Sequence, residues 1–411
     1  MAGAGFKDFQ AGAKLTANEV DTYLMQQSVM RFADSSARSS AIGTAIAEGM
    51  VSYLDSTNNI EVYDGAAWNP VSAGATSPNY ILNADMTINQ RGFSTNTASS
   101  GPGMMNDMWR GVATGNANSF TYSIQDLAPG TISVAQQGSK HLRCAVSGLS
   151  TSTHYAVIWQ KIENARLLAG QTVTVSFYAK SVSGTAKIAS SMLRLYGTGG
   201  SPSTGEFVIE AQTFDLTTSW ARYSYTATIP SDSGKTYGTN NDSHLRLDFT
   251  IAAGVAISGD GGVGITDRTT DIWGVQVEVG SSATAFRNNQ PNPQAELAAC
   301  QRYYITTDAS PSTTMIYGGT SSGGFSPNAY HSYRFPVQMR TTPTITFYAH
   351  DGTAGAVSLY VSGTPIKSTS VASIGASPWG WSGNFAGNSP SWSTNADSGM
   401  LAFGFKAEAE L

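Results

Sequence analysis

The chain has 411 residues, which is enough for two or three domains of ordinary size. Charged residues make up 12% of it, about half the usual share, so Ser, Thr, Asn, Gln and Gly must cover much of the surface. That composition is typical of an all-β surface protein and argues against a cytosolic enzyme. The net charge is −5 and no basic run occurs, which argues against nucleic-acid binding. No stretch of about 18 apolar residues occurs either, so membrane insertion is not expected.

Cysteines are rare, and the two in the chain are Cys144 and Cys300. They fall in different predicted domains, so we expect two buried free thiols and no disulfide between them. The first 15 residues contain no apolar stretch of the kind found in a signal peptide. We therefore expect a protein that is made in a cytoplasm and released by lysis.

The N-terminal segment begins with a helical pattern. Thr16 to Glu19 matches the S/T-x-x-E capping box, which predicts a helix from there to about Asp34. Side chains spaced i, i+3, i+4, i+7 and i+10 form one face of this helix, and they are Val20, Tyr23, Leu24, Gln27 and Met30. A weaker helical pattern follows over residues 35–42.

The pattern then changes to the period of two that is typical of strands. Polar turns at Ser56–Asn59 and Asp64–Gly65 predict a small β-hairpin that ends near Trp68. A short helix and a hairpin bury little apolar surface alone, so we expect residues 1–70 to dock on a partner or on copies of themselves. Residues 71–79 are a linker of Ser, Ala, Gly and Pro.

Residues 80–287 carry spaced strand patterns separated by Gly, Ser and Asn turns, which predict a β-sandwich of the jelly-roll type. The strongest strand patterns cover 155–162, 172–179, 220–229 and 244–251. In the last of these, large apolar side chains alternate with Arg246, Asp248 and Thr250, which face the opposite side. We expect residues 288–411 to form a C-terminal β domain after a short helix. Its clearest strand patterns are 344–349 and 356–361.

The stretch from Gly274 to Tyr304 joins the two β regions and reads GVQVEVGSSATAFRNNQPNPQAELAACQRYY. An alternating strand is followed by a Gly-Ser-Ser turn, a linker with Pro291 and Pro293, and a short helix from about Gln294. This stretch resembles the hinge of many bacteriophage tail-fibre and receptor-binding proteins. In that family, a strand ending in EVGSSATPF-like residues leads to an ELALCQRYY-like helix.

Further segments resemble the same family. Phe335–Arg340 followed by Pro343 is similar to its FPVPMRxxPT segment, and Ala407–Leu411 is similar to its usual ending. The segment from Tyr23 to Trp68 is similar to the N-terminal module that attaches many phage minor tail proteins to the virion. The order of elements in the central region resembles the carbohydrate-binding-module-like domains that recur in tail fibres.

The resemblance implies a structural virion protein, a tail fibre or minor tail protein that binds the host cell surface for adsorption, through glycan. It implies a homotrimer whose residues 1–70 attach to other tail proteins, and a trimer would bury the helical face described above. It places receptor contact in residues 288–411. Two alternatives stay open: a head- or collar-decorating fibre without a primary receptor role, and a depolymerase that degrades glycan.

Aromatic residues in the C-terminal region are the main candidates for receptor contact. The C–H faces of sugar rings stack on aromatic side chains, and loops of rigid β scaffolds are where such side chains gather. The candidates for glycan binding are Trp379, Trp381, Trp392, Tyr330 and His331. The same composition suits packing against a neighbouring subunit or against the core of the domain itself. The tryptophans expected in the core are Trp109, Trp159, Trp220 and Trp273.

Signals for metals and catalysis are few. Asp260, Asp267 and Asp271 lie close together in sequence and are candidates for a structural Ca²⁺ site, although ordinary turn aspartates share this spacing. The five histidines lack metal-ligand spacing. G-x-S-x-G at 319–323 and G-x-G-x-x-G at 259–264 lack the flanking elements that a nucleophile elbow and a dinucleotide site need. The spacing of the carboxylates does not support a glycosidase pair. We therefore expect no enzyme and no cofactor, and a structural calcium at these aspartates is the alternative.

Overall fold

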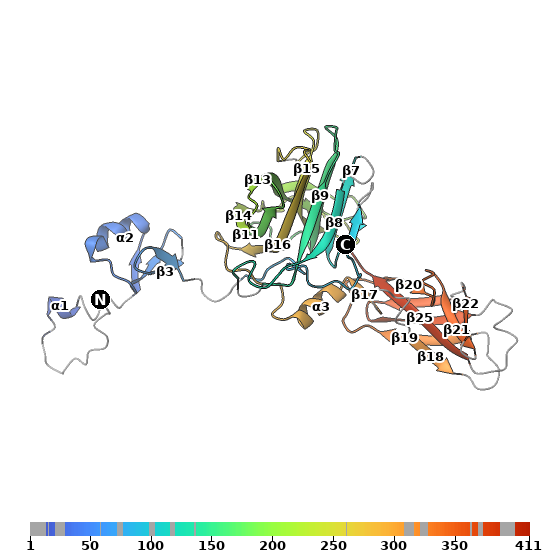
Figure 1. Ribbon diagram of the computed structural model, residues 1–411. Helices are drawn as coiled ribbons and strands as arrows, with labels where there is room; N and C mark the ends of the chain where they lie inside the picture. The colour runs from blue at the N-terminus through green and yellow to red at the C-terminus, as the bar shows by residue number, and fades with distance from the viewer. Residues whose placement is uncertain are drawn as a thin grey trace. The chain divides into compact units, whose positions relative to one another are not determined.

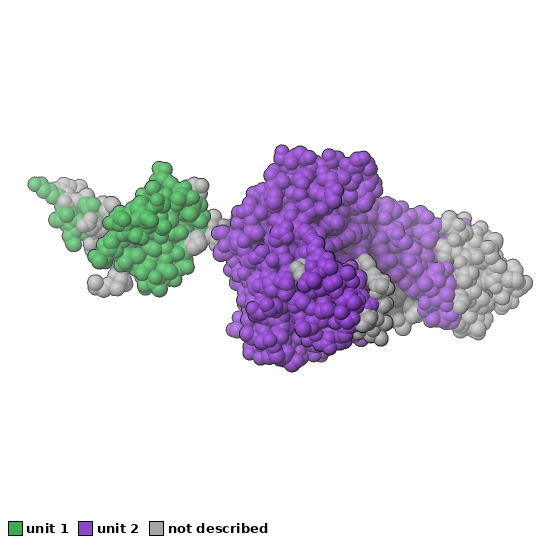
Figure 2. All heavy atoms as spheres, turned by 90° about the horizontal axis from the view of Figure 1, so that it is seen from above, with its two compact units in different colours: residues 1–77 green, residues 78–411 purple. Residues whose placement is uncertain are grey.

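The computed structural model forms two compact units, residues 1–77 and residues 78–411, which are coloured in Figure 2 and drawn as ribbons in Figure 1. The structure describes residues 14, 16–20, 29–57, 59–71, 77–97, 103–115, 120–134, 137–259, 261–307, 316–320, 328–361, 364–368, 373–386 and 399–411. Of the helices in these ranges, none is long and apolar enough to cross a membrane.

The first unit is built from a small sheet and short helical segments. Its elements are α1 (Ala17–Glu19), β1 (Val29–Phe32), α2 (Ser35–Ile42), a 3-10 turn (Gly43–Ala45), β2 (Val51–Leu54), β3 (Asn59–Tyr63) and β4 (Trp68–Pro70). The strand order is β1-β2-β3-β4, with β1 parallel to β2. Arg38 of α2 is buried, where its guanidinium lies 4.0 Å from the centre of the Trp68 ring and donates to Ser52 Oγ at 2.9 Å. These contacts tie the helix to the sheet.

The helix predicted to start at Thr16 does not reach its predicted end at Asp34. Met30 lies in β1 instead, because this segment pairs with β2. Asp34 Oδ1 accepts a hydrogen bond from Ala37 N at 2.8 Å and so caps α2, which confirms the helical pattern over residues 35–42. The predicted hairpin is confirmed as β2 and β3. Of the predicted helical face, Val20 and Met30 are described, and the residues outside the described ranges are Tyr23, Leu24 and Gln27.

The second unit contains a β-sandwich of two six-stranded sheets, and this confirms the predicted mainly β fold. The first sheet has the order β13 (Glu206–Leu216), β12 (Ala186–Leu195), β15 (His244–Ala253), β10 (Tyr155–Glu163), β7 (Trp109–Thr114) and β6 (Gly103–Met104). The second sheet has the order β14 (Ala221–Thr228), β11 (Thr172–Ser181), β16 (Arg268–Val279), β9 (Lys140–Val146), β8 (Phe120–Asp126) and β5 (Thr95–Thr97). The four strongest predicted strands correspond to β10, β11, β14 and β15.

One large hydrophobic core holds the sandwich together. Its biggest members include Trp109, Phe177, Phe249 and Trp273, all fully buried. Trp109 and Trp273 are therefore in the core as predicted, and Trp220 packs against its margin. The two cysteines are free and buried, which confirms the prediction of lone thiols.

The C-terminal part of the second unit has its own aromatic core. Its elements are α3 (Pro293–Gln301), β17 (Tyr304–Thr306), β18 (Ile316–Thr320), β19 (Asn328–Arg334), β20 (Thr344–Tyr348), β21 (Val357–Val361), β22 (Thr364–Ser368), β23 (Ser373–Ser377), β24 (Gly380–Ala386) and β25 (Gly399–Glu408). β25 pairs with β17, β18, β20 and β21, and a separate three-stranded sheet has the order β19-β24-β23. Phe347, Phe403 and Phe405 are among the fully buried side chains of this core.

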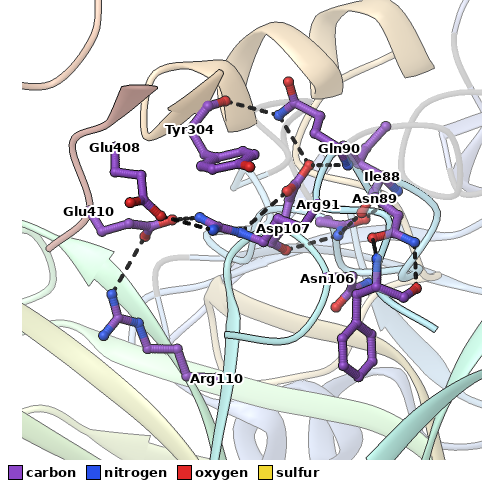
Figure 3. A network of polar contacts seen from close by, with 12 residues as sticks. Ile88, Asn89, Gln90, Arg91, Asn106, Asp107, Arg110, Tyr304, Glu408 and Glu410 are labelled. Carbon is purple, nitrogen blue, oxygen red and sulfur yellow. Dashed lines mark hydrogen bonds and ion pairs between the residues drawn. The ribbon is translucent and has the colours of Figure 1, made fainter. Parts of the chain in front are cut away.

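A dense polar network joins the sandwich to the C-terminal part, at the seam expected from the sequence (Figure 3). The Arg91 guanidinium lies 3.7 Å from the centre of the Tyr304 ring and forms ion pairs with Glu408 at 3.5 Å and with Glu410. Asp107 lies 3.7 Å from the other side of the same guanidinium. The seam is thus a packed junction, and the predicted short helix beside it is confirmed as α3.

A second set of contacts fastens the same junction. Glu163 of β10 accepts hydrogen bonds from Arg302 at 2.9 and 3.1 Å and from the Tyr303 hydroxyl at 2.8 Å. Lys161 Nζ donates to the Leu411 carbonyl oxygen at 2.7 Å. The end of β10 that is nearest the seam therefore binds residues from both ends of the C-terminal part.

Candidate functional site

The outward face of the first sandwich sheet carries the strongest candidate site. Along β10, Ala156 and Ile158 belong to the core, so the intervening Val157 and Trp159 face away from it. Trp159 lies opposite Asp248 of β15 in the ladder between these strands. An aromatic ring and a carboxylate are thus neighbours on the face of the sheet that is opposite to the core.

These outward side chains line a pocket of about 440 Å³. The pocket crosses five strands, from β13 to β7, and the loop after β15 contributes Ile257 and Ser258. At a spacing of about 4.8 Å between strands, the four intervals span roughly 19 Å. Its aromatic members are Tyr155, Trp159 and Phe207, and its polar members include Ser191, Arg246, Asp248 and Thr250.

The charged groups of the pocket are paired with each other. Arg246 Nε and Nη2 donate to the two carboxylate oxygens of Asp248, both at 2.7 Å. Burial raises the pKa of the Asp248 carboxyl, although the neighbouring Arg246 guanidinium opposes this shift. The same guanidinium lies 5.3 Å from the centre of the Trp159 ring, which fixes the indole by a cation–π contact.

Trp159 has one polar atom that the described residues leave unsatisfied. Its side chain is only 7% exposed, and its indole Nε1 is buried without a hydrogen-bond partner in the described part of the chain. A buried N–H without a partner is unfavourable, so an acceptor that reached Nε1 would stabilise this group. Trp159 is therefore buried as predicted, but its ring lies on the face of the sheet opposite to the large core cluster.

The C-terminal candidates from the sequence fall into different environments. Trp381 does not lie in a loop as predicted: it is in β24, is 3% exposed, and its ring packs against Phe347 and Phe405. His331 packs on the same Trp381 ring at 5.8 Å between ring centres. Trp379 is 54% exposed at the turn between β23 and β24. Tyr330 lies in β19, and Trp392 is outside the described residues.

The predicted calcium ligands have other partners. Asp271 is fully buried and accepts hydrogen bonds from Arg143 at 2.7 and 2.9 Å, with Lys180 3.6 Å away. Asp267 Oδ1 accepts from Gly148 N at 2.8 Å, and Asp260 lies outside the described residues. Within the described ranges, no group of three or more His, Cys, Asp or Glu side chains is placed to hold a metal ion. Calcium binding stays a prediction.

The depolymerase alternative needs two free carboxyl groups across a cleft. Of the carboxylates in the sandwich, Asp248 and Asp271 are engaged by arginines as described above. Glu278 is buried and lies 3.3 Å from Arg287 Nη2, while Asp215 is largely exposed. These side chains have the environment of structural ion pairs or open surface.

Comparison with known proteins finds one family match within the sandwich. Residues 112–238 match a carbohydrate binding domain family. That span includes Tyr155, Trp159 and Phe207 of the pocket, whereas Arg246 and Asp248 lie beyond it. The comparison with curated proteins found no match.

Three solved structures illustrate the likeness. The enzymatically active domain of bacteriophage CBA120 tailspike protein 4 has 14% identity and a TM-score of 0.30, covering 49% of this chain and 21% of that chain. The family 11 carbohydrate-binding module from Clostridium thermocellum has 12% identity and a TM-score of 0.26, covering 47% and 99%. The xylan-binding CBM22-2 domain from Paenibacillus barcinonensis Xyn10C has 16% identity and a TM-score of 0.26, covering 40% and 94%. This chain thus spans about a fifth of the tailspike structure.

The pocket on the sandwich was not among the sites predicted from the sequence. A signal for it existed in the strand over residues 244–251, where Arg246, Asp248 and Thr250 alternate with the core side chains. The sequence pattern showed that these residues share a face. It did not show that β10 lies beside them and adds Trp159, because strand neighbours are set by topology.

Proposed function

We propose that this chain is a saccharide-binding adhesin whose primary site is the pocket around Trp159. The observation that carries the proposal is the buried, unsatisfied Trp159 Nε1 beside the Arg246–Asp248 pair, within a pocket that also holds two other aromatic rings. A sugar ring can stack its C–H face on an aromatic side chain while its hydroxyls accept from Nε1 and donate to Asp248. Pockets of this size with a few fixed polar groups are typical ligand sites.

A saccharide array followed by isothermal titration tests the proposal. We expect Trp159→Ala to raise the dissociation constant of the best array ligand at least about ten-fold, which corresponds to about 1.4 kcal/mol. The matched control is Trp220→Ala, because Trp220 follows β13 in the chain, packs on His141 at 5.4 Å and does not line the pocket. Unchanged binding by the Trp159 variant, or an array that retains no saccharide, would contradict the proposal.

We infer that the binding serves adsorption of a bacteriophage to its host, with this chain as a trimeric tail fibre or minor tail protein made in the host cytoplasm. The resemblance of Gly274–Tyr304, Phe335–Arg340 and Ala407–Leu411 to tail-fibre segments supports this inference. The first unit would attach to other tail proteins. Several copies of the chain on one virion would bind the cell surface together, so weak contacts with single sugars would add up to firm attachment.

Two measurements test the assignment to a tail fibre. Native mass spectrometry should give three times the chain mass, and a monomer at micromolar concentration would contradict the trimer. Electron cryo-microscopy of the virion should place the chain on the tail. Density on the head or collar would favour a decorating fibre without a primary receptor role.

A further inference from the structure

The C-terminal part carries a second surface with the features of a ligand site. It is a shallow pocket of about 400 Å³ on the β19-β24-β23 sheet. Trp379 lines it at the turn between β23 and β24, and Arg334 lines it at the end of β19. The side chains of Ser332 and Ser382 add hydroxyl groups on the same face.

Trp379 is presented on a turn that backbone contacts hold in place. Its carbonyl oxygen accepts from Phe335 N at 2.9 Å, and the preceding Pro378 carbonyl accepts from Met339 N at 2.8 Å. Gly380 follows directly, and a Cβ there would lie 2.3 Å from the Tyr333 carbonyl oxygen, so only glycine allows the turn to approach β19 this closely. Trp379 is 54% exposed on this turn, and its backbone would lose little freedom when a ligand binds.

Arg334 carries a charge that nothing in the described residues neutralises. Its side chain is exposed, and it forms no hydrogen bond or ion pair with another described residue. Among the described residues that line this pocket there is no Asp or Glu. The sandwich pocket differs, because its arginine is held by Asp248. A free guanidinium binds carboxylate, sulfate and phosphate groups through two parallel hydrogen bonds.

We propose that this surface binds a saccharide that carries an anionic group, with a sugar ring stacked on Trp379 and the anion on Arg334. The anion is a uronic carboxylate or a sulfate ester, which share the same bidentate chemistry. The neighbouring serine hydroxyls accept hydrogen bonds from the remaining sugar hydroxyls and donate hydrogen bonds to them. The proposal concerns a site separate from the sandwich pocket, and it holds whether or not that pocket binds sugar.

Isothermal titration of the intact chain with three probes tests this site. The probes are trigalacturonate, a sulfated galactotriose and neutral galactotriose. We expect Arg334→Gln and Trp379→Ala each to raise the dissociation constant of an anionic probe at least about ten-fold, or about 1.4 kcal/mol. The matched control is Arg166→Gln, which removes one exposed arginine charge elsewhere in the same unit and should leave binding unchanged.

The outcomes separate the second site from the first. Loss of trigalacturonate binding alone identifies the carboxylate as the ligand group, and loss of sulfated galactotriose binding alone identifies the sulfate. The proposal is overturned if neither anionic probe binds, or if Arg334→Gln and Trp379→Ala bind both as the wild type does. It is also overturned if Arg334→Gln weakens neutral galactotriose equally. Binding that depends on Trp159 but not on Arg334 supports the proposed function and refutes this second site.

Discussion

Replacing Trp381 by alanine should strongly destabilise the C-terminal part of the chain and not merely remove a receptor contact. The ring is 3% exposed and lies within 6.4 Å of six other aromatic rings, measured between ring centres. A buried Trp withdraws about 150–250 Å² from water. At about 25 cal/mol per Å² this area corresponds to roughly 4–6 kcal/mol. Measured losses for such replacements are about 3–5 kcal/mol, a large share of the about 5–15 kcal/mol that stabilises a domain.

Trp379→Ala is the natural control, because it makes the same change two positions earlier at a side chain that is 54% exposed. Urea unfolding followed by circular dichroism, together with limited proteolysis of the C-terminal part, would compare the two variants. We expect Trp381→Ala to be cleaved rapidly and to unfold at lower urea, and Trp379→Ala to cost under about 1 kcal/mol. Equal unfolding midpoints for the two variants would refute the core role of Trp381.

Three further predictions concern ion pairs. Burial raises the pKa of Asp271, but hydrogen bonds and charges from Arg143 and His141 lower it overall to about 2. Its stabilisation is therefore complete above the unfolded pKa of about 3.9 and is lost as the pH falls through about 2. Asp271→Asn should cost about 2 kcal/mol at pH 7 and progressively less toward pH 2, and parallel pH curves for both proteins would contradict this. Glu163→Gln should cost about 1 kcal/mol, because its pairs are partly exposed, and should speed proteolysis between the sandwich and the C-terminal part; an unchanged rate would count against the junction. EDTA should leave the unfolding midpoint unchanged, because Arg143 occupies both Asp271 oxygens; a lower midpoint would indicate a bound metal.

Local pattern was a good guide where a strand or helix depends on its own side chains. The alternation around Leu245 and Phe249 predicted β15, and the proline and polar residues before Gln294 predicted the start of α3. The same reasoning gave a wrong prediction at Met30. The segment around Met30 forms a strand because it pairs with β2, which is distant in sequence. Trp381 lies in a Gly- and Ser-rich stretch that is typical of a loop, yet β19 and β23 pair on either side of it.

The site was harder to predict than the fold. Trp159 sits in an apolar strand, and the sequence does not distinguish a ring that packs into the core from one that packs on the outward face. That distinction depends on which strands flank β10. The pairing of β10 with both β15 and β7 joins residues about 90 and 50 positions apart into one face, and no local pattern encodes it.

The packed junction around Arg91 has a consequence for how this protein would meet a surface. Ion pairs at several points fasten the sandwich to the C-terminal part, and these contacts would restrict changes in the distance between the pocket at Trp159 and the surface at Trp379. Two sites joined by a flexible tether can adjust to almost any ligand spacing. Two sites at a fixed distance bind together only when the ligand spacing matches that distance. Two sites at a fixed separation would gain avidity only on a polymer whose two ligand groups recur at the matching interval. Discrimination between cell surfaces would then depend on the spacing of sugars as much as on their identity.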